Sequence, residues 1–115
     1  MRKERLTKTS QFAAVYEGGD SRVNKLVVMK ALPNGLQTTR CGFTVSKRVG
    51  NAVVRNRVKR RIREGVNQMS LEPGWEIVFV ARAAASKADY HSLEDAARGL
   101  LRQAHLLRET EVRGS

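Results

Sequence analysis

Apolar residues recur three or four positions apart in three stretches of the chain, which is the spacing of an amphipathic helix. The first stretch, residues 11–17, is short and carries Phe12 and Tyr16 on one face. Hydroxyl side chains at Thr9 and Ser10 are candidate N-caps, and a glycine pair after the stretch is a stop signal. A short helix is therefore expected, and from spacing alone its two aromatic rings fit core packing.

The longest helical pattern covers residues 52–69 and follows a break at Gly50-Asn51. Five of its apolar residues fall within an arc of roughly 120°, with basic residues mostly outside it. These five are Val54, Val58, Ile62, Val66 and Met69. A third pattern begins after Asp89, a candidate N-cap. Its apolar stripe consists of Leu93, Ala97, Leu100, Leu101, Ala104 and Leu107.

Three other stretches favour strands. Residues 23–32 are rich in β-branched and apolar side chains, residues 41–46 alternate, and residues 75–81 form a compact apolar run typical of a buried strand. The turn signal Pro33-Asn34-Gly35 predicts that the first two strands pair as an antiparallel hairpin. The order helix, strand, strand, helix, strand, helix predicts an α/β (α+β) fold, a two-layer sandwich with a small mixed sheet.

The length of 115 residues fits a single domain, residues 1–115, with loosely ordered ends at about 1–8 and 110–115. The amino terminus lacks the apolar segment of a secretory signal, and no apolar run is long enough to span a membrane. Cys41 is the single cysteine and lies in an apolar stretch, so we expect a small buried side chain rather than a reactive thiol. These features predict a cytoplasmic protein.

Charge changes this picture, because it is concentrated in one region. Residues 46–63 hold eight Lys or Arg and no acid, and residues 21–63 hold twelve and no acid. The rest of the chain is almost neutral, so this region accounts for the net charge of +11. Five cations lie within residues 57–63 on a helical pattern. They repel one another unless a polyanion neutralises them, which points to nucleic acid or an anionic surface.

No residue spacing matches a familiar catalytic or metal motif. His91 and His105 lie outside any C-x-x-C or H-E-x-x-H context, so a zinc site has no support. The glycines lack the spacing of a phosphate-binding loop. Glu94-Asp95 fits the charged first turn of a helix rather than a metal cluster. We therefore expect neither catalytic residues nor metal ligands in this chain.

Several classes of partner are compatible with the basic helix. An RNA-binding module, such as a ribosomal protein, fits the composition, and Asn56 between two arginines offers an amide for a base edge, a 2′-hydroxyl or a backbone turn. A DNA-binding regulator is less well supported, because the chain lacks a two-helix turn motif. A lipid surface is weaker still, since the apolar face of the helix is needed for the core.

Residues 50–61, GNAVVRNRVKRR, closely resemble the RNR motif of the bacterial ribonuclease P protein family. The similarity covers nearly the full chain. Arg5-Leu6 followed by the Phe12 and Tyr16 helix is similar to the family's amino-terminal segment, and residues 42–47 are similar to the strand before the motif. Residues 75–82, followed by alanines and a closing helix, also fit. The RNR segment is far more specific than a generic basic stretch.

This resemblance implies a left-handed βαβ crossover through the basic helix, which the usual rule for crossovers would not predict. It also implies the protein subunit of a ribonucleoprotein endonuclease that removes the 5′ leader from precursor tRNA. Catalysis would belong to the RNA subunit, with magnesium ions bound mainly by RNA. The expected partners are ribonuclease P RNA and precursor tRNA, with no membrane and no obligate protein partner.

The resemblance also assigns residues to two surfaces. The RNA-binding surface would consist of Lys47, Arg48, Asn51, Arg55, Asn56, Arg57, Lys59, Arg60, Arg61 and Arg63. The cleft for the single-stranded leader would be lined by Phe12, Tyr16, Met29, Thr44 and Ser46. Some family members place an aromatic residue near the position of Met29, so this chain departs from them at that point.

Overall fold

A five-stranded mixed sheet organises the protein in the computed structural model, which describes residues 3–108. The strands are β1 (Lys3–Arg5), β2 (Asp20–Val23), β3 (Val27–Pro33), β4 (Thr39–Val45) and β5 (Trp75–Ala81). Their order across the sheet is β1-β4-β5-β3-β2. Strands β1, β4 and β5 run parallel to one another, whereas β3 is antiparallel to β5 and β2 is antiparallel to β3.

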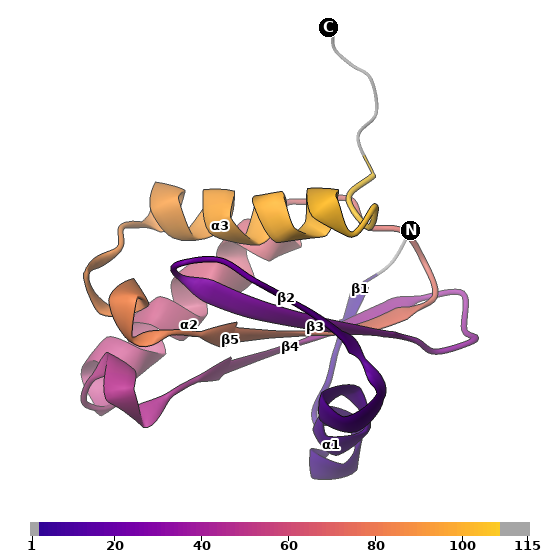
Figure 1. Ribbon diagram of the computed structural model, residues 1–115, viewed down its shortest axis with the longest axis horizontal. Coiled ribbons are helices and arrows are strands. Elements are labelled where there is room, and N and C mark those ends of the chain that lie inside the picture. Colours follow the sequence, from indigo (N-terminus) through magenta and orange to yellow (C-terminus); the bar gives the residue numbers. More distant parts are fainter. Residues whose placement is uncertain (1–2, 109–115) are drawn as a thin grey trace, which may run out of the picture.

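Helices lie on both faces of this sheet (Figure 1). Helix α1 (Thr9–Gly18) packs on one face with Leu6 and Val78, which form a small apolar cluster with its Val15. Helices α2 (Ala52–Asn67) and α3 (Tyr90–Gln103) share the main core on the other face. Two short 3-10 helices, η1 (Lys47–Val49) and η2 (Ala83–Lys87), precede α2 and α3.

The predicted elements and their order are confirmed, and so is the mixed α+β class. On α2, the predicted apolar arc is the buried side of the helix, with Val58, Ile62 and Val66 at most 1% exposed. Burying each such side chain stabilises the fold by about 1.5–3 kcal/mol. Asp89 caps α3 as expected, accepting the Ser92 backbone N–H at 2.8 Å.

The predicted hairpin between the first two predicted strands, which correspond to β3 and β4, is wrong. Strand β5 lies between β3 and β4 and pairs with both. Its residues Ile77, Val78 and Phe79 are all 0% exposed, so both faces of this strand are covered. The most apolar strand gains most from a central position, and it displaces the local pairing that the turn favours. The turn itself exists, with Gly35 at φ +72°.

Two short strands at the sheet edges were not predicted. Strand β2 has an exposed side chain at three of its four positions, and β1 comprises only three residues. Such short segments show little apolar periodicity in the sequence. They are recognised as strands only through their pairing with β4 and β3. Strand β1 and the buried Leu6 lie within the first eight residues, where a loosely ordered end was expected. The other expected loose end, 110–115, lies outside the described residues.

The predicted N-cap of α1 is also wrong. Thr9 is already the first helical residue, and the side chain of Gln11 folds back instead. Its Oε1 accepts the backbone N–H groups of Thr7 and Lys8 at 3.1 and 3.0 Å. A glutamine amide thus satisfies donors at the start of the helix, as in the return half of a capping box.

Strands β4 and β5 are parallel neighbours, and α2 connects them. The connection is the βαβ crossover expected from the resemblance. Its left-handed sense stays a prediction. The crossover places the amino-terminal end of α2 just after the carboxyl end of β4, which brings the basic helix close to the sheet residues described next.

Candidate nucleic-acid interface

Side-chain caps shape the approach to α2. The Ser46 hydroxyl accepts the Arg48 backbone N–H at 3.2 Å and starts η1. Asn51 Oδ1 accepts the Val54 backbone N–H at 3.0 Å and starts α2. Val49 between them is buried, whereas Lys47 and Arg48 are exposed. Both caps satisfy backbone donors that a helix start leaves free, so the cations beside them are held on ordered backbone.

The basic residues of α2 occupy three sides of the helix around its buried face. Asn56 and Arg60 are exposed on the outer side. Arg57 and Arg61, half-buried on one flank, donate to backbone carbonyls after β5: Nη2 of Arg57 to Ser86 at 3.4 Å and Nη1 of Arg61 to Ala88 at 3.0 Å. The opposite flank carries half-buried cations at Arg55, Lys59 and Arg63.

Within residues 3–108, the two ion pairs are Arg40–Glu76 and Arg98–Glu94. Neither uses a cation of α2 or η1. The buried Nε of Arg57 also lacks a hydrogen-bond partner among the described groups. Most of the positive charge of this helix is therefore left without an ion pair in the part of the chain that the structure describes.

A second surface lies on the α1 face of the sheet. The rings of Phe12 and Tyr16 are 6.5 Å apart between centroids and tilted by 43°. Tyr16 is 41% exposed, and its hydroxyl lies 3.5 Å from Oγ1 of Thr44 on β4. Phe12 is half-buried and packs against the cluster formed by Leu6, Val15 and Val78. The ring of Phe12 thus contributes to packing while part of it stays exposed.

The ring of Phe12 packs directly against Gly42 on β4. A Cβ atom on Gly42 would lie only 2.5 and 2.6 Å from Cε1 and Cζ of the ring. No real side chain fits at that separation, so the absence of a Cβ allows the ring to rest directly on β4. This contact holds α1 close to the sheet at the rim of the exposed surface.

The α1 face of the sheet includes residues that the sequence pattern did not indicate. Thr44 is in register with Val80, Val80 with Val28, and Val28 with Val23. Directly paired residues point to the same face of a sheet, and Val80 packs against the α1 cluster. A row of partly exposed side chains therefore crosses four strands. Residues two apart on each predicted strand share a face, but the pattern does not say which face.

The structure corrects the placement of Met29. This residue is in register with Phe79, is 1% exposed and belongs to the core under α2 and α3. Met29 therefore points away from α1, and its neighbours Val28 and Lys30 take the α1 face instead. Ser46 follows the end of β4, and its hydroxyl is engaged in the cap of η1.

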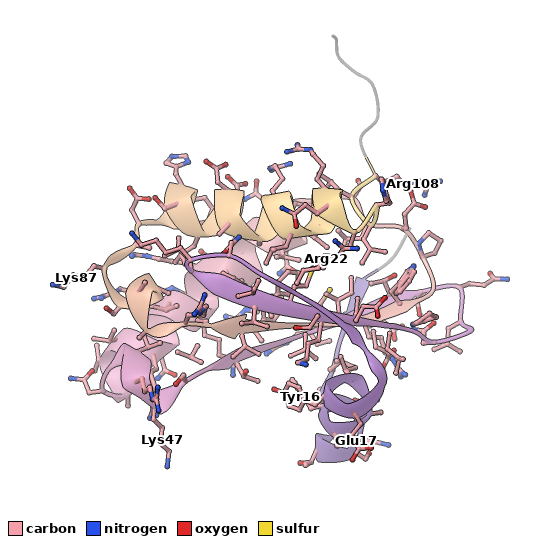
Figure 2. All side chains as sticks on the ribbon, viewed as in Figure 1. Tyr16, Glu17, Arg22, Lys47, Lys87 and Arg108 are labelled. Carbon is pink, nitrogen blue, oxygen red and sulfur yellow. The ribbon has the colours of Figure 1, made fainter. Side chains whose placement is uncertain are left out.

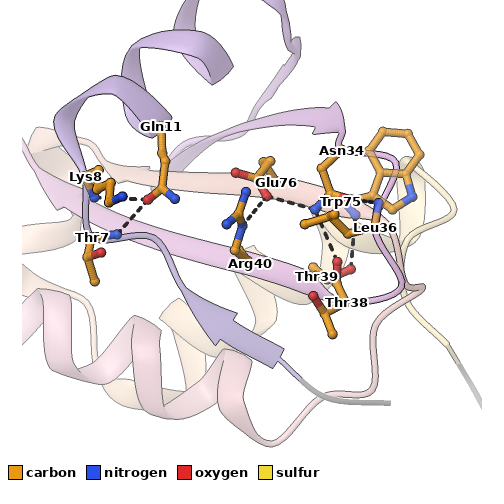
Figure 3. Close-up of polar contacts among 10 residues, drawn as sticks. All are labelled: Thr7, Lys8, Gln11, Asn34, Leu36, Thr38, Thr39, Arg40, Trp75 and Glu76. Carbon is orange, nitrogen blue, oxygen red and sulfur yellow. Dashed lines mark hydrogen bonds and ion pairs between the residues drawn. The ribbon is translucent and has the colours of Figure 1, made fainter.

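A polar network occupies the opposite end of the α1 face, near the β3–β4 turn (Figure 3). Arg40 Nε donates to Oε2 of Glu76 at 2.6 Å, and Asn34 Nδ2 donates to the same oxygen at 2.8 Å. The hydrogen bond to Glu76 raises the pKa of Arg40 above its usual value, against the opposing effect of burial. This acid is satisfied internally, so it does not oppose the basic surface.

The described residues hold no cluster of three or more His, Cys, Asp or Glu side chains suited to a metal ion. Cys41 is buried at 4% exposure, as the sequence predicts. None of the helices in residues 3–108 has the length and apolarity that crossing a bilayer requires.

Comparison with known proteins identifies the family. The sequence model of the family named Ribonuclease P matches residues 1–105. The ribonuclease P protein component of Caldanaerobacter subterraneus subsp. tengcongensis is 42% identical over 109 residues, which cover 93% of this chain and 94% of that protein. The component of Dehalococcoides mccartyi is 42% identical over 111 residues, covering 96% and 92%.

Solved structures agree with the sequence comparison. The RNase P protein of Staphylococcus aureus matches with a TM-score of 0.82 and 29% identity, over 93% of this chain and all of that chain. The RNase P protein of Thermotoga maritima matches with a TM-score of 0.76 and 25% identity, over 96% and 99%. Similarity in sequence and fold over most of the chain shows that it belongs to the ribonuclease P protein component family, a part of the endoribonuclease ribonuclease P.

Proposed function

We propose that this chain binds the RNA subunit of ribonuclease P through α2 and the 5′ leader of precursor tRNA through the α1 face. Removal of the leader would yield the mature 5′ end. The RNA subunit would catalyse the cleavage with magnesium ions that RNA mainly holds. In this assignment the protein contributes binding and positioning in the cytoplasm, and no side chain of the chain takes part in the chemistry.

The observation that carries the proposal is the closeness of two different surfaces around the end of β4. One is the set of α2 and η1 cations without internal ion pairs among residues 3–108. The other is the partly exposed aromatic and aliphatic surface around Tyr16 and Thr44. Figure 2 shows Lys47 beyond one end of the sheet and Tyr16 on the α1 side.

These surfaces suit different parts of an RNA complex. Guanidinium groups match phosphate oxygens and release counterions from a folded RNA. Aromatic faces and small aliphatic side chains suit unpaired bases, which a leader offers and a duplex does not. Cations between the RNA subunit and the leader would also lower the repulsion between these two RNA strands. Less magnesium would then be needed for cleavage.

The direct test is reconstitution with ribonuclease P RNA at low magnesium. We expect the chain to restore cleavage of precursor tRNA and to increase affinity for precursor over mature tRNA. Absence of both effects would refute the proposal.

The cleft is tested by Phe12→Leu, which keeps an apolar side chain on Gly42 and removes the aromatic face. We expect weaker binding of precursor tRNA, by about three- to tenfold, with mature tRNA unchanged. Tyr90→Ala, which removes a half-buried ring from α3 on the other side of the sheet, serves as the control. Equal losses for precursor and mature tRNA would contradict the cleft role.

A further inference from the structure

A pocket lies where β4 becomes the open edge of the sheet. Pairing between β1 and β4 ends with Arg5 opposite Cys41, followed by a hydrogen bond from Leu6 N to Cys41 O at 2.9 Å. Beyond this point β1 no longer covers β4, and residues 42–45 have a strand neighbour only in β5. The lining residues are Arg5, Leu6, Thr7, Phe12, Cys41, Gly42, Phe43 and Lys59.

This pocket connects the two surfaces already described. Phe12 enters it from α1, and Lys59 enters it from the flank of α2 that also carries Arg55 and Arg63. Gly42 belongs to the α1 face, whereas Phe43 belongs to the core under α2. The pocket therefore passes around the edge of β4 rather than lying on one face.

The charges in the pocket have one sign. Arg5 and Lys59 are its two ionisable side chains apart from the buried Cys41, and no acid lines it. Neither cation takes part in the two ion pairs of residues 3–108. Glu4, the acid next to Arg5 in sequence, is in register with Arg40 and interacts with that guanidinium instead. Two unpaired cations on an apolar floor attract a phosphate that is joined to a flat apolar group.

The backbone contributes a further feature. On an open strand edge, alternate residues present N–H and C=O groups that lack a strand partner. These groups can bond to the edges of a base or to a ribose hydroxyl, while the ring of Phe12 provides an apolar wall. Phosphate, sugar and base of one unpaired nucleotide thus each have a complementary group in this pocket.

We propose that the pocket is a nucleotide subsite in which the leader strand crosses the edge of β4 between the α1 cleft and α2. Arg5 and Lys59 hold one leader phosphate, and Phe12 contacts the adjoining base. This inference rests on the proposed function, because the strand is assigned to the leader on the ground that the pocket is continuous with Phe12. It adds Arg5, which the basic segment does not contain, to the substrate-binding residues.

The test couples a protein charge to a single leader phosphate. Precursor tRNAs with one neutral methylphosphonate at successive leader positions are bound to holoenzymes containing the wild-type chain or Arg5→Ala. We expect Arg5→Ala to weaken precursor binding about three- to tenfold and mature tRNA binding not at all. At one leader position the methylphosphonate should weaken the wild type but cause little further loss in Arg5→Ala, which is the signature of a direct contact.

The controls distinguish failure of this inference from failure of the proposed function. Arg108→Ala removes an exposed arginine beyond the end of α3 and should leave every affinity unchanged. Lys59→Met, which keeps the apolar stem, should couple to the same phosphate as Arg5→Ala. Equal losses of precursor and mature tRNA would assign the pocket to the RNA subunit and overturn the inference, as would absence of coupling at every position. If the wild type itself does not distinguish precursor from mature tRNA, the proposed function fails instead.

Discussion

At the scale of single residues, the packing of α1 on the sheet depends on a residue without a side chain. Phe12 rests on β4 because Gly42 leaves room for its ring. The contact ties α1 to the strand that continues toward α2. One packing contact therefore affects both the stability of the sheet face and the position of the proposed leader site.

Gly42→Ala tests this contact. The new Cβ would overlap the Phe12 ring, so the ring or the strand must move, at a cost of about 1–3 kcal/mol. Urea denaturation should report this loss, and precursor tRNA should bind more weakly. The control is Gly99→Ala in α3, where a Cβ meets no atom within 4 Å. This substitution should stabilise the helix by about 0.5–1 kcal/mol. Unchanged stability of Gly42→Ala would contradict the close packing of Phe12 on Gly42.

Asn51 illustrates a residue with a structural role and a predicted binding role. Its side chain caps α2, so Asn51→Ala should cost about 1 kcal/mol. Asn51→Ser retains a capping oxygen and should cost much less. If the amide also contacts RNA, as the resemblance implies, Asn51→Ser will weaken RNA binding without lowering thermal stability. Wild-type affinity for the serine variant would limit Asn51 to the cap.

At the scale of elements, α2 combines a core face with three charged sides. The flank with Arg57 and Arg61 fastens the helix to the segment after β5 through two carbonyl hydrogen bonds. The cations on the outer side and the opposite flank make no such hydrogen bonds to backbone carbonyls among residues 3–108. Substitutions on different sides of this helix should therefore divide into effects on stability and effects on RNA binding.

Arg61→Ala and Arg60→Ala provide this comparison. Loss of the hydrogen bond from Arg61 to Ala88 should lower the free energy of unfolding by about 0.5–1.5 kcal/mol. Arg60 is exposed on the outer side, so Arg60→Ala should leave stability almost unchanged. Chemical denaturation of both variants checks the expectation. Equal stability losses would show that the two sides of α2 are not distinct.

The cap of α3 gives this element a dependence on pH. The hydrogen bond from the Ser92 backbone lowers the pKa of Asp89, with smaller contributions from the Ser92 side chain, His91 and Arg61. A carboxyl with a lower pKa in the folded state stabilises the fold above its unfolded pKa. This contribution is lost as the pH falls through the folded value. Asp89→Ala should thus melt at a lower temperature than wild type at neutral pH, and the gap should close in acid below pH 3.8.

Asp95→Ala removes an exposed carboxylate further along α3 and is the matched control for this pH dependence. A gap between Asp89→Ala and wild type that persists unchanged through acid pH would contradict the role of the ionised cap.

At the scale of the whole molecule, charge is segregated along the chain and across its surface. Residues 21–63 contain no acid, and the acids at Glu76 and Glu94 are paired internally. A polyanion therefore meets little local competition at the basic region, where Glu64 is the exposed acid that follows Arg63 on α2. Binding to RNA should accordingly be governed by counterion release and should weaken as salt increases.

The salt dependence of binding locates the contacts. Each phosphate contact removed should flatten the plot of log affinity against log salt by about 0.7–0.9. We expect this change for Arg60→Ala with ribonuclease P RNA. Arg108→Ala carries the same change in net charge on the other part of the molecule and should leave the slope unaltered. Identical slopes for the two variants would mean that net charge alone, rather than the α2 surface, drives binding.

Helical periodicity predicted α2 and α3, their buried faces and the cap of α3 from the sequence alone. Such features depend on residues within a few positions of one another, so local patterns are sufficient. Strand pairing was different. The turn at Pro33-Asn34-Gly35 favoured a hairpin, but β5 took the central position because burial of both its faces outweighs a local connection.

The features of the candidate site also divide into local ones and ones that depend on contacts between distant segments. The concentration of charge on one helix and the family resemblance of residues 50–61 follow from the amino-acid order alone, since both are properties of neighbouring residues. The folded chain was needed to show that Met29 lies in the core, that Val28 and Val80 lie on the α1 face, and that Arg5, Lys59 and Phe12 line one pocket. Those relations depend on which strands are adjacent and which face each presents, and contacts between distant segments establish both.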